Sequence, residues 1–122
     1  MLEKRKTPRF DIPIKIEYSR VSSDKKSLLS CSKDISMRGV RITAEEKFSS
    51  DDILDLAFYL PNRPVQEALG KVMWQSEDKA GFDTGIRFLN IRDSLKEDIF
   101  DYLNKYFPSK LQEKWWAKAK SV

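Results

Sequence analysis

The first two thirds of the chain consist of short runs in which apolar and polar residues alternate. From Ile12 to Tyr18 every second residue is apolar, with Lys15 and Glu17 among the polar positions between them. A period of two is typical of a strand that buries one face. Similar runs separated by turn-forming residues predict six strands, at positions 12–18, 28–33, 39–44, 54–60, 65–75 and 82–88. Gly85 in the last run predicts a close approach of neighbouring backbone.

The period changes after Asn90, where the apolar residues take helical spacing at positions 91, 95, 99, 103 and 107. Ser94 precedes Glu97 by three residues, which is the spacing of a capping box at the start of a helix. Pro108 marks the expected end of this helix, because proline does not continue one.

Six short strands followed by one helix predict an all-β domain, a six-stranded antiparallel β-barrel with a C-terminal α-helix. Closing the sheet removes its exposed edges, and a helix covers an open end of the barrel. We expect a mobile basic segment over residues 1–11, the barrel and its helix over 12–107, and a C-terminal extension over 108–122.

The C-terminal extension has a helical pattern of its own. Leu111, Trp115 and Ala119 form one stripe, and Trp116 stands beside it. Adjacent tryptophans favour a second short helix that docks on the barrel or on the first helix. The lysines around them leave open a helix that binds a partner protein or a membrane surface.

The net charge of +4 is concentrated at the two ends of the 122-residue chain. Residues 1–9 and residues 110–120 each carry a net charge of +3, so the sequence between them is weakly acidic. A barrel that binds nucleic acid presents a basic face along the whole backbone that it contacts. The distribution therefore argues against DNA or RNA and favours a small anion held by one segment.

Missing residue types restrict the chemistry. The chain has no histidine and one cysteine, Cys31, which excludes histidine general bases, histidine triads and thiolate zinc sites. Phosphate-binding glycine loops and nucleophile elbows are missing too. We therefore expect a binding protein rather than an enzyme, with no metal and no cofactor. The charged N-terminus, the lack of a transmembrane segment and the lone cysteine favour the cytoplasm.

Two arginines, Arg5 and Arg9, stand four residues apart just ahead of the first predicted strand. A guanidinium group binds phosphate or a guanine edge through paired hydrogen bonds and stacks on a base plane. Two such groups on a short segment stiffened by Pro8 are suited to hold a guanine nucleotide. A solvated basic tail is the other interpretation of this motif.

A second motif lies between the second and third predicted strands, where Asp34, Ser36 and Gly39 follow the pattern DxSxxG. An aspartate accepts two hydrogen bonds from the Watson–Crick edge of guanine, a serine hydroxyl binds phosphate, and a glycine leaves room for a ligand. The same residue types are frequent in ordinary turns for backbone reasons. The motif alone leaves both interpretations open.

Taken together, the RxxxR pair, the DxSxxG motif and a final GIRF strand followed by a helix resemble the PilZ domain, the bacterial receptor module for cyclic di-GMP. The resemblance covers nearly the whole chain and implies a six-stranded barrel with a C-terminal helix. It implies that Arg5 and Arg9 bind the phosphates and guanines. It also implies that Asp34, Ser36 and Gly39 bind a guanine edge and the adjoining ribose phosphate.

Lys4 and Trp74 are further candidates on the same resemblance. In this family the residue before the first arginine influences whether one or two ligand molecules bind, and Lys4 leaves that number open. Trp74 stands where some members place a tryptophan beside the nucleotide, although burial in the core or at the barrel rim suits an indole equally. Lys6 and Arg38 are left outside the expected site.

The resemblance implies a receptor whose basic N-terminal segment becomes ordered over the barrel when cyclic di-GMP binds. Such a receptor regulates an unidentified downstream protein, with motility, exopolysaccharide or biofilm formation as the output. We expect a monomer or a ligand-dependent dimer. A PilZ-like adaptor that binds proteins but no nucleotide is the alternative, and the intact motifs argue against it.

Overall fold

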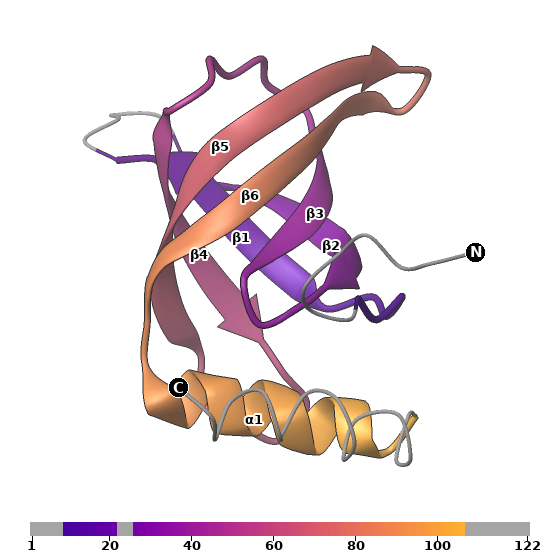
Figure 1. Cartoon of the computed structure of the whole chain (residues 1–122), viewed down its shortest axis with the longest axis vertical. Helices are drawn as coiled ribbons and strands as arrows, with labels where there is room; N and C mark the ends of the chain where they lie inside the picture. Colours follow the sequence, from indigo (N-terminus) through magenta and orange to yellow (C-terminus); the bar gives the residue numbers. More distant parts are fainter. Residues whose placement is uncertain (1–8, 22–25, 107–122) are drawn as a thin grey trace.

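Six strands and one helix make up the computed structural model, which describes residues 9–21 and 26–106 (Figure 1). The strands are β1 (Lys15–Arg20), β2 (Leu28–Ile35), β3 (Gly39–Ala44), β4 (Ile53–Tyr59), β5 (Gln66–Asp78) and β6 (Gly81–Ile91), and the helix is α1 (Asp93–Asn104). The expectations for residues 1–8 and for the C-terminal extension lie outside the described residues.

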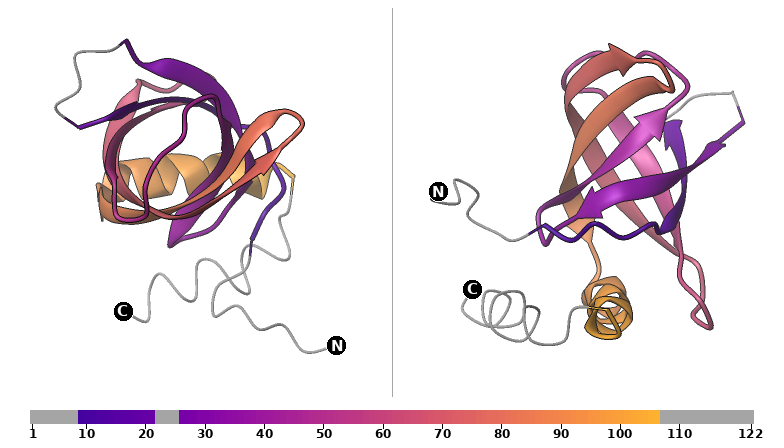
Figure 2. Two further views of the ribbon diagram at one scale, coloured as in Figure 1. Left: turned by 90° about the horizontal axis from the view of Figure 1, so that it is seen from above. Right: turned by 90° about the vertical axis from the view of Figure 1, so that its right-hand side faces the viewer.

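The six strands form one closed barrel in the order β1-β2-β3-β6-β5-β4, and every neighbouring pair is antiparallel. Figure 2 shows this barrel from above, with the strands enclosing its interior. The predicted fold class is confirmed. Strands β5 and β6 are the longest and continue as a hairpin to Asp78 and Gly81, where Gly81 turns the chain with a φ of 139° that favours glycine (Figure 1).

Strand β1 begins later than predicted, because a side chain replaces part of its hydrogen-bond ladder. Ile12 and Ile14 are buried, as the alternation predicts, but β1 begins only at Lys15. The Ser32 hydroxyl accepts a hydrogen bond from the Ile14 amide at 2.8 Å and donates one to the Ile12 carbonyl. The pairing of β2 with β3 shifts register between Ser32 and Asp34. Such a bulge changes the direction of the side chains that follow it.

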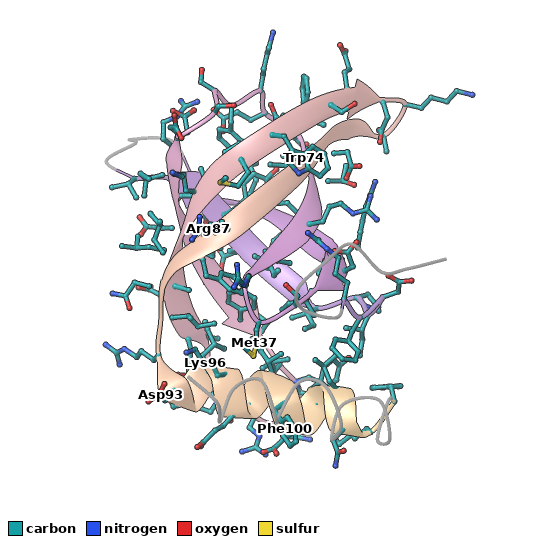
Figure 3. The ribbon with its side chains drawn as sticks, in the orientation of Figure 1. Met37, Trp74, Arg87, Asp93, Lys96 and Phe100 are labelled. Atoms are coloured by element: carbon teal, nitrogen blue, oxygen red, sulfur yellow. The ribbon has the colours of Figure 1, made fainter. Side chains whose placement is uncertain are left out.

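The apolar faces of the strands form one core inside the barrel. Its largest fully buried side chains are Tyr18, Phe10, Phe58, Ile14, Ile16, Ile35, Ile42, Leu54, Leu56, Leu95, Ile99 and Leu103. The last three belong to α1, which lies across one end of the barrel (Figures 1 and 2). Met37 from the β2–β3 turn and Phe100 from α1 pack against the same core (Figure 3). The helix thereby shields the apolar interior from water.

The start of α1 differs from the predicted capping box. The residue ahead of the helix is Arg92, which makes no capping hydrogen bond with its side chain. Ser94 lies inside the first turn, and its hydroxyl donates to Gln66 Oε1 at 2.7 Å. The capping-box prediction is wrong because α1 begins at Asp93, directly after Arg92, so Ser94 lies inside the helix and not at its N-cap. The helix ends at Asn104, and no helix among the described residues is long and apolar enough to cross a membrane.

Ionisation of Tyr18 is expected to make the barrel less stable at alkaline pH. Its side chain is fully buried, and its hydroxyl oxygen accepts a hydrogen bond from the Glu45 amide at 2.8 Å. Burial raises the pKa of Tyr18, and the Glu45 amide offsets only part of this effect. Below the unfolded value of about 10, Tyr18 is neutral in both states. Above it, the unfolded chain loses the proton first, so the free energy of unfolding falls as pH rises.

We expect Tyr18→Phe to weaken this alkaline loss of stability. One ionising group changes the free energy of unfolding by at most about 1.4 kcal/mol per pH unit. The variant is also expected to be less stable at neutral pH, since the Glu45 amide loses its acceptor. Urea denaturation at neutral pH and at about pH 11 measures both effects. If the free energy of unfolding falls equally between the two pH values in wild type and in Tyr18→Phe, Tyr18 ionises as easily in the folded protein as in the unfolded chain.

Candidate functional site

Phe10 fixes the chain ahead of β1 to the barrel and carries Arg9 with it. The Phe10 side chain is fully buried, and its backbone forms an antiparallel bridge with Ile35 at the end of β2, with N···O distances of 2.9 and 3.0 Å. Burial of an aromatic ring is strongly favourable, so the residue next to it is held in place. Arg9 therefore lies beside the end of β2, while Arg5 and Lys4 are outside the described residues.

The Asp34 carboxylate joins Arg9 to the barrel. Asp34 Oδ1 accepts a hydrogen bond from Arg9 Nη1 at 2.8 Å, and Asp34 Oδ2 accepts one from Arg41 Nε at 2.8 Å. Only 6% of the Asp34 side chain is exposed, and a carboxylate buried to this extent needs such charged partners. In this structure both carboxylate oxygens are therefore bound by arginines. The contact of Asp34 with a guanine edge stays a prediction.

Arg41 continues the contacts to a third strand. Its Nη1 donates to Asp83 Oδ2 at 3.0 Å, and Lys33 Nζ lies 3.4 Å from Asp83 Oδ1. Burial lowers the pKa of Arg41, but the Asp34 and Asp83 carboxylates outweigh burial and raise that pKa above its ordinary value. The result is a line of alternating charges, called the ion-pair chain below: Arg9, Asp34, Arg41, Asp83 and Lys33.

The DxSxxG motif folds as a tight turn between β2 and β3. The Ser36 amide donates to the Gly39 carbonyl at 2.9 Å, and the buried Ser36 hydroxyl accepts a hydrogen bond from the Arg38 amide at 3.2 Å. A Cβ atom on Gly39 would lie 2.1 Å from the Ile86 carbonyl oxygen, so only glycine fits there. These residues do form a turn, and their contact with a ligand stays a prediction.

Trp74 lies on the outside of the barrel against Gly85. The register of β5 and β6 shifts between Val72 and Trp74 and pairs Trp74 with Gly85. A Cβ atom on Gly85 would lie 2.3 Å from the indole Nε1, so the ring fills the space that the glycine leaves. The space beside Gly85 is therefore filled by an aromatic side chain, whereas the sequence predicts a close approach of neighbouring backbone at this position. Trp74 is 42% exposed, which places it on the surface and not in the core.

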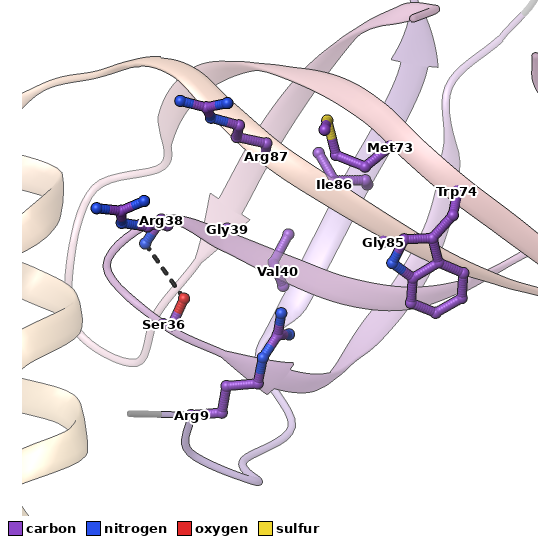
Figure 4. A pocket seen from close by; sticks show the side chains of 10 residues that line it. All are labelled: Arg9, Ser36, Arg38, Gly39, Val40, Met73, Trp74, Gly85, Ile86 and Arg87. Atoms are coloured by element: carbon purple, nitrogen blue, oxygen red, sulfur yellow. Dashed lines mark hydrogen bonds between the residues drawn. The ribbon is translucent and has the colours of Figure 1, made fainter. Parts of the chain in front are cut away.

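These side chains surround a cleft of about 300 Å³ on the outside of the barrel (Figure 4). Its lining residues are Arg9, Ser36, Arg38, Gly39, Val40, Met73, Trp74, Gly85, Ile86 and Arg87. The cleft thus unites four of the predicted site residues: Arg9, Ser36, Gly39 and Trp74. Asp34 adjoins it through its ion pair with Arg9.

The cleft also contains two arginines that the predicted site omits, Arg38 and Arg87. Arg87 follows Gly85 by two residues in a strand, so both belong to one face, and it pairs with Gly39 across β3 and β6. Figure 4 shows Arg38 and Arg87 on one side of the cleft, with Trp74 at its other end. The spacing of Arg87 from Gly85 is the one signal that the sequence offered.

The charge and shape of the cleft define what it can bind. Three arginines, Arg9, Arg38 and Arg87, line the same cleft as the partly exposed indole of Trp74. Guanidinium groups bind phosphate oxygens in pairs, and an indole face stacks on flat aromatic groups. No cluster of acidic or cysteine side chains that could hold a metal ion occurs within residues 9–21 and 26–106. The arrangement suits an anion that carries aromatic rings.

Comparison with known proteins gives the family. The family model of the PilZ domain matches residues 3–105. The fold is similar to the PilZ domain with c-di-GMP of YcgR from Escherichia coli, with 14% identity and a TM-score of 0.65 over 88% of this chain and 98% of that one. No match was found among the curated proteins.

Two longer proteins contain a similar fold. The MrkH–c-di-GMP complex of K. pneumonia matches with 16% identity and a TM-score of 0.69, over 93% of this chain and 56% of that one. The Inhibitor of motility MotI/DgrA of Bacillus subtilis matches with 19% identity and a TM-score of 0.64, over 86% and 54%. The chain therefore spans about half the length of these two proteins. At such identities the likeness shows a shared fold.

Proposed function

Because the chain belongs to the PilZ domain family, we propose that it is a receptor for cyclic di-GMP and not an enzyme. The observation that carries the proposal is the cleft that Arg9, Arg38, Arg87 and Trp74 line together. Cyclic di-GMP has two phosphates and two guanines. Its negative charges match the guanidinium groups, and its bases match the exposed indole face.

In the proposed complex, arginine side chains contact both the phosphates and the guanines of the ligand. Arg9 and Arg5 bind phosphate oxygens and stack on or hydrogen-bond the guanines, and Trp74 stacks on a base. Arg38 and Arg87 add positive charge on the opposite side of the cleft. Lys4, next to Arg5, bears on whether one or two ligand molecules bind.

The DxSxxG turn supplies the other contacts. Asp34 and Ser36 bind a guanine edge and the adjoining ribose phosphate, and Gly39 lines the cleft beside them. The Ser36 hydroxyl accepts a bond from the Arg38 amide, and a hydroxyl that accepts one bond still has a proton to donate to phosphate.

Binding of the ligand changes the surface that the protein presents. Contacts to Arg5 and Arg9 draw the N-terminal segment over the cleft, and the ligand itself covers Trp74. Charge-assisted hydrogen bonds of roughly 1.5–3 kcal/mol each offset the entropy cost of ordering that segment. A downstream protein that distinguishes the two surfaces is regulated by the ligand.

Calorimetric titration of cyclic di-GMP into the protein tests the proposal. We expect saturable binding with a Kd of about 1 μM or tighter, close to −8 kcal/mol or stronger. The double variant Arg5→Ala/Arg9→Ala is expected to lose it. GTP and cyclic di-AMP are the matched controls. GTP has a guanine but lacks the ring of two phosphodiesters, and cyclic di-AMP keeps that ring but has adenines in place of the guanines.

The outcomes separate two functions. Heat with cyclic di-GMP and none with the two control nucleotides supports the receptor. A folded protein that gives neither heat nor a thermal shift with cyclic di-GMP contradicts it, and makes a nucleotide-independent adaptor the leading function. The same titration curve gives the number of ligand molecules per chain.

A further inference from the structure

The ion-pair chain beside the cleft contains an arginine that the proposed binding site does not use. We infer that Arg41 is a positioning residue, which sets the place of Arg9 in the cleft by acting through Asp34. The inference rests on the proposed function. Arg41 is not among the residues that line the cleft, so it acts on a ligand through Arg9.

The geometry gives Arg41 a fixed place between two carboxylates. Arg41 Nε lies 2.8 Å from Asp34 Oδ2 and Arg41 Nη1 lies 3.0 Å from Asp83 Oδ2, so the planar group spans both. In the barrel Arg41 pairs with Asp34 on one side and with Gly85 on the other. Strands β2, β3 and β6 therefore all contribute to the position of this guanidinium group.

Asp34 transmits that position to Arg9. Its carboxylate is 6% exposed and accepts Arg9 on Oδ1 and Arg41 on Oδ2. A carboxylate held on one oxygen by a rigid partner presents the other oxygen in a defined direction. Arg9 precedes the bridge at Phe10, so its guanidinium depends on Asp34 for part of its orientation.

Loss of Arg41 harms ligand binding in two ways. The Asp34 carboxylate is no longer fixed, so the Arg9 guanidinium loses a defined direction. In addition, Arg9 becomes the only arginine of the ion-pair chain beside Asp34, which strengthens the Arg9–Asp34 ion pair. A ligand phosphate then has to compete with this stronger ion pair for Arg9. Both effects weaken binding of an anion at Arg9.

The test uses two variants of opposite charge change, Arg41→Gln and Asp83→Ala. Positioning predicts that both weaken cyclic di-GMP binding, Arg41→Gln by about tenfold and Asp83→Ala by about threefold. A general effect of charge predicts opposite signs, because removing Asp83 makes the surface more positive. Arg20→Gln and Asp52→Ala are matched controls, since Arg20 and Asp52 form an ion pair at 3.2 Å and neither lines the cleft.

The binding outcomes decide between positioning and general charge. Weakening by both test variants, with the controls within about twofold of wild type, supports positioning. Opposite signs, or unchanged affinity in both test variants, overturn it. Thermal denaturation shows which variants are folded, and Asp83→Ala decides alone if Arg41→Gln does not fold.

A second readout in the protein without ligand keeps this inference separate from the proposed function. The side-chain Nε–Hε resonance of Arg9 reports the surroundings of its guanidinium group. It is expected to move in Arg41→Gln and Asp83→Ala and to stay in place in Arg20→Gln. An unmoved Arg9 resonance overturns the positioning role, whether or not cyclic di-GMP binds, while failure of the wild-type protein to bind contradicts only the proposed function.

Discussion

Arg9→Ala is expected to weaken cyclic di-GMP binding by at least about 100-fold, because the substitution removes two or more charge-assisted hydrogen bonds of roughly 1.5–3 kcal/mol each. The fold is expected to survive, since Arg9 is partly exposed and Asp34 keeps its ion pair with Arg41. Titration of labelled cyclic di-GMP followed by fluorescence anisotropy measures the change.

Arg20→Ala is the matched control for this loss. Arg20 is also a partly exposed arginine paired with a carboxylate, at 3.2 Å from Asp52, but it is not part of the cleft. We expect its affinity to stay within about twofold of wild type. An Arg9→Ala variant that binds as well as Arg20→Ala would place the ligand elsewhere on the protein.

Gly39→Ala is expected to destabilise the barrel by about 3 kcal/mol or more. Its Cβ atom would lie 2.1 Å from the Ile86 carbonyl oxygen, which is backbone of the neighbouring strand β6 and is fixed by the β3–β6 ladder. Relief requires β3 and β6 to separate next to the cleft. Urea denaturation measures the loss of stability.

Gly70→Ala is the control for Gly39. A Cβ atom there would meet the Ile86 Cγ2 and Leu56 Cδ1 methyl groups, at 2.4 and 3.1 Å, and side-chain ends move more easily than backbone. We therefore expect a smaller loss of stability than at Gly39. Equal losses would mean that the β3–β6 pair yields as readily as a side chain does, and that Gly39 has no special structural role.

The barrel follows from local patterns in the sequence. Alternation places Ile16 and Tyr18 inward, and the change to helical spacing places Leu95 and Ile99 on the buried face of α1. The capping box fails because α1 begins one residue before Ser94, whose hydroxyl donates to Gln66 of β5 instead. Periodicity identifies an element, while its ends depend on partners from elsewhere in the chain.

The cleft was predictable only where a motif lies within one segment. Ser36 and Gly39 stand on the same turn, whereas the approach of Trp74 to Gly85 depends on a bulge in the β5–β6 register. The ion-pair chain needs the register of three strands, so nothing in the sequence links Arg41 to Asp34. Contacts between strands are set by pairing, which residue types alone do not define.

Mapping cyclic di-GMP onto the protein by amide chemical shifts is the most direct test of the cleft as the receptor site. We predict that saturating ligand shifts the amides of residues 36–39 and 85–87 and the indole N–H of Trp74. The amides of Lys15–Arg20 in β1 are predicted to stay near their starting positions. Shifts concentrated on β1, or none with a folded protein, would contradict the assignment of this cleft to cyclic di-GMP.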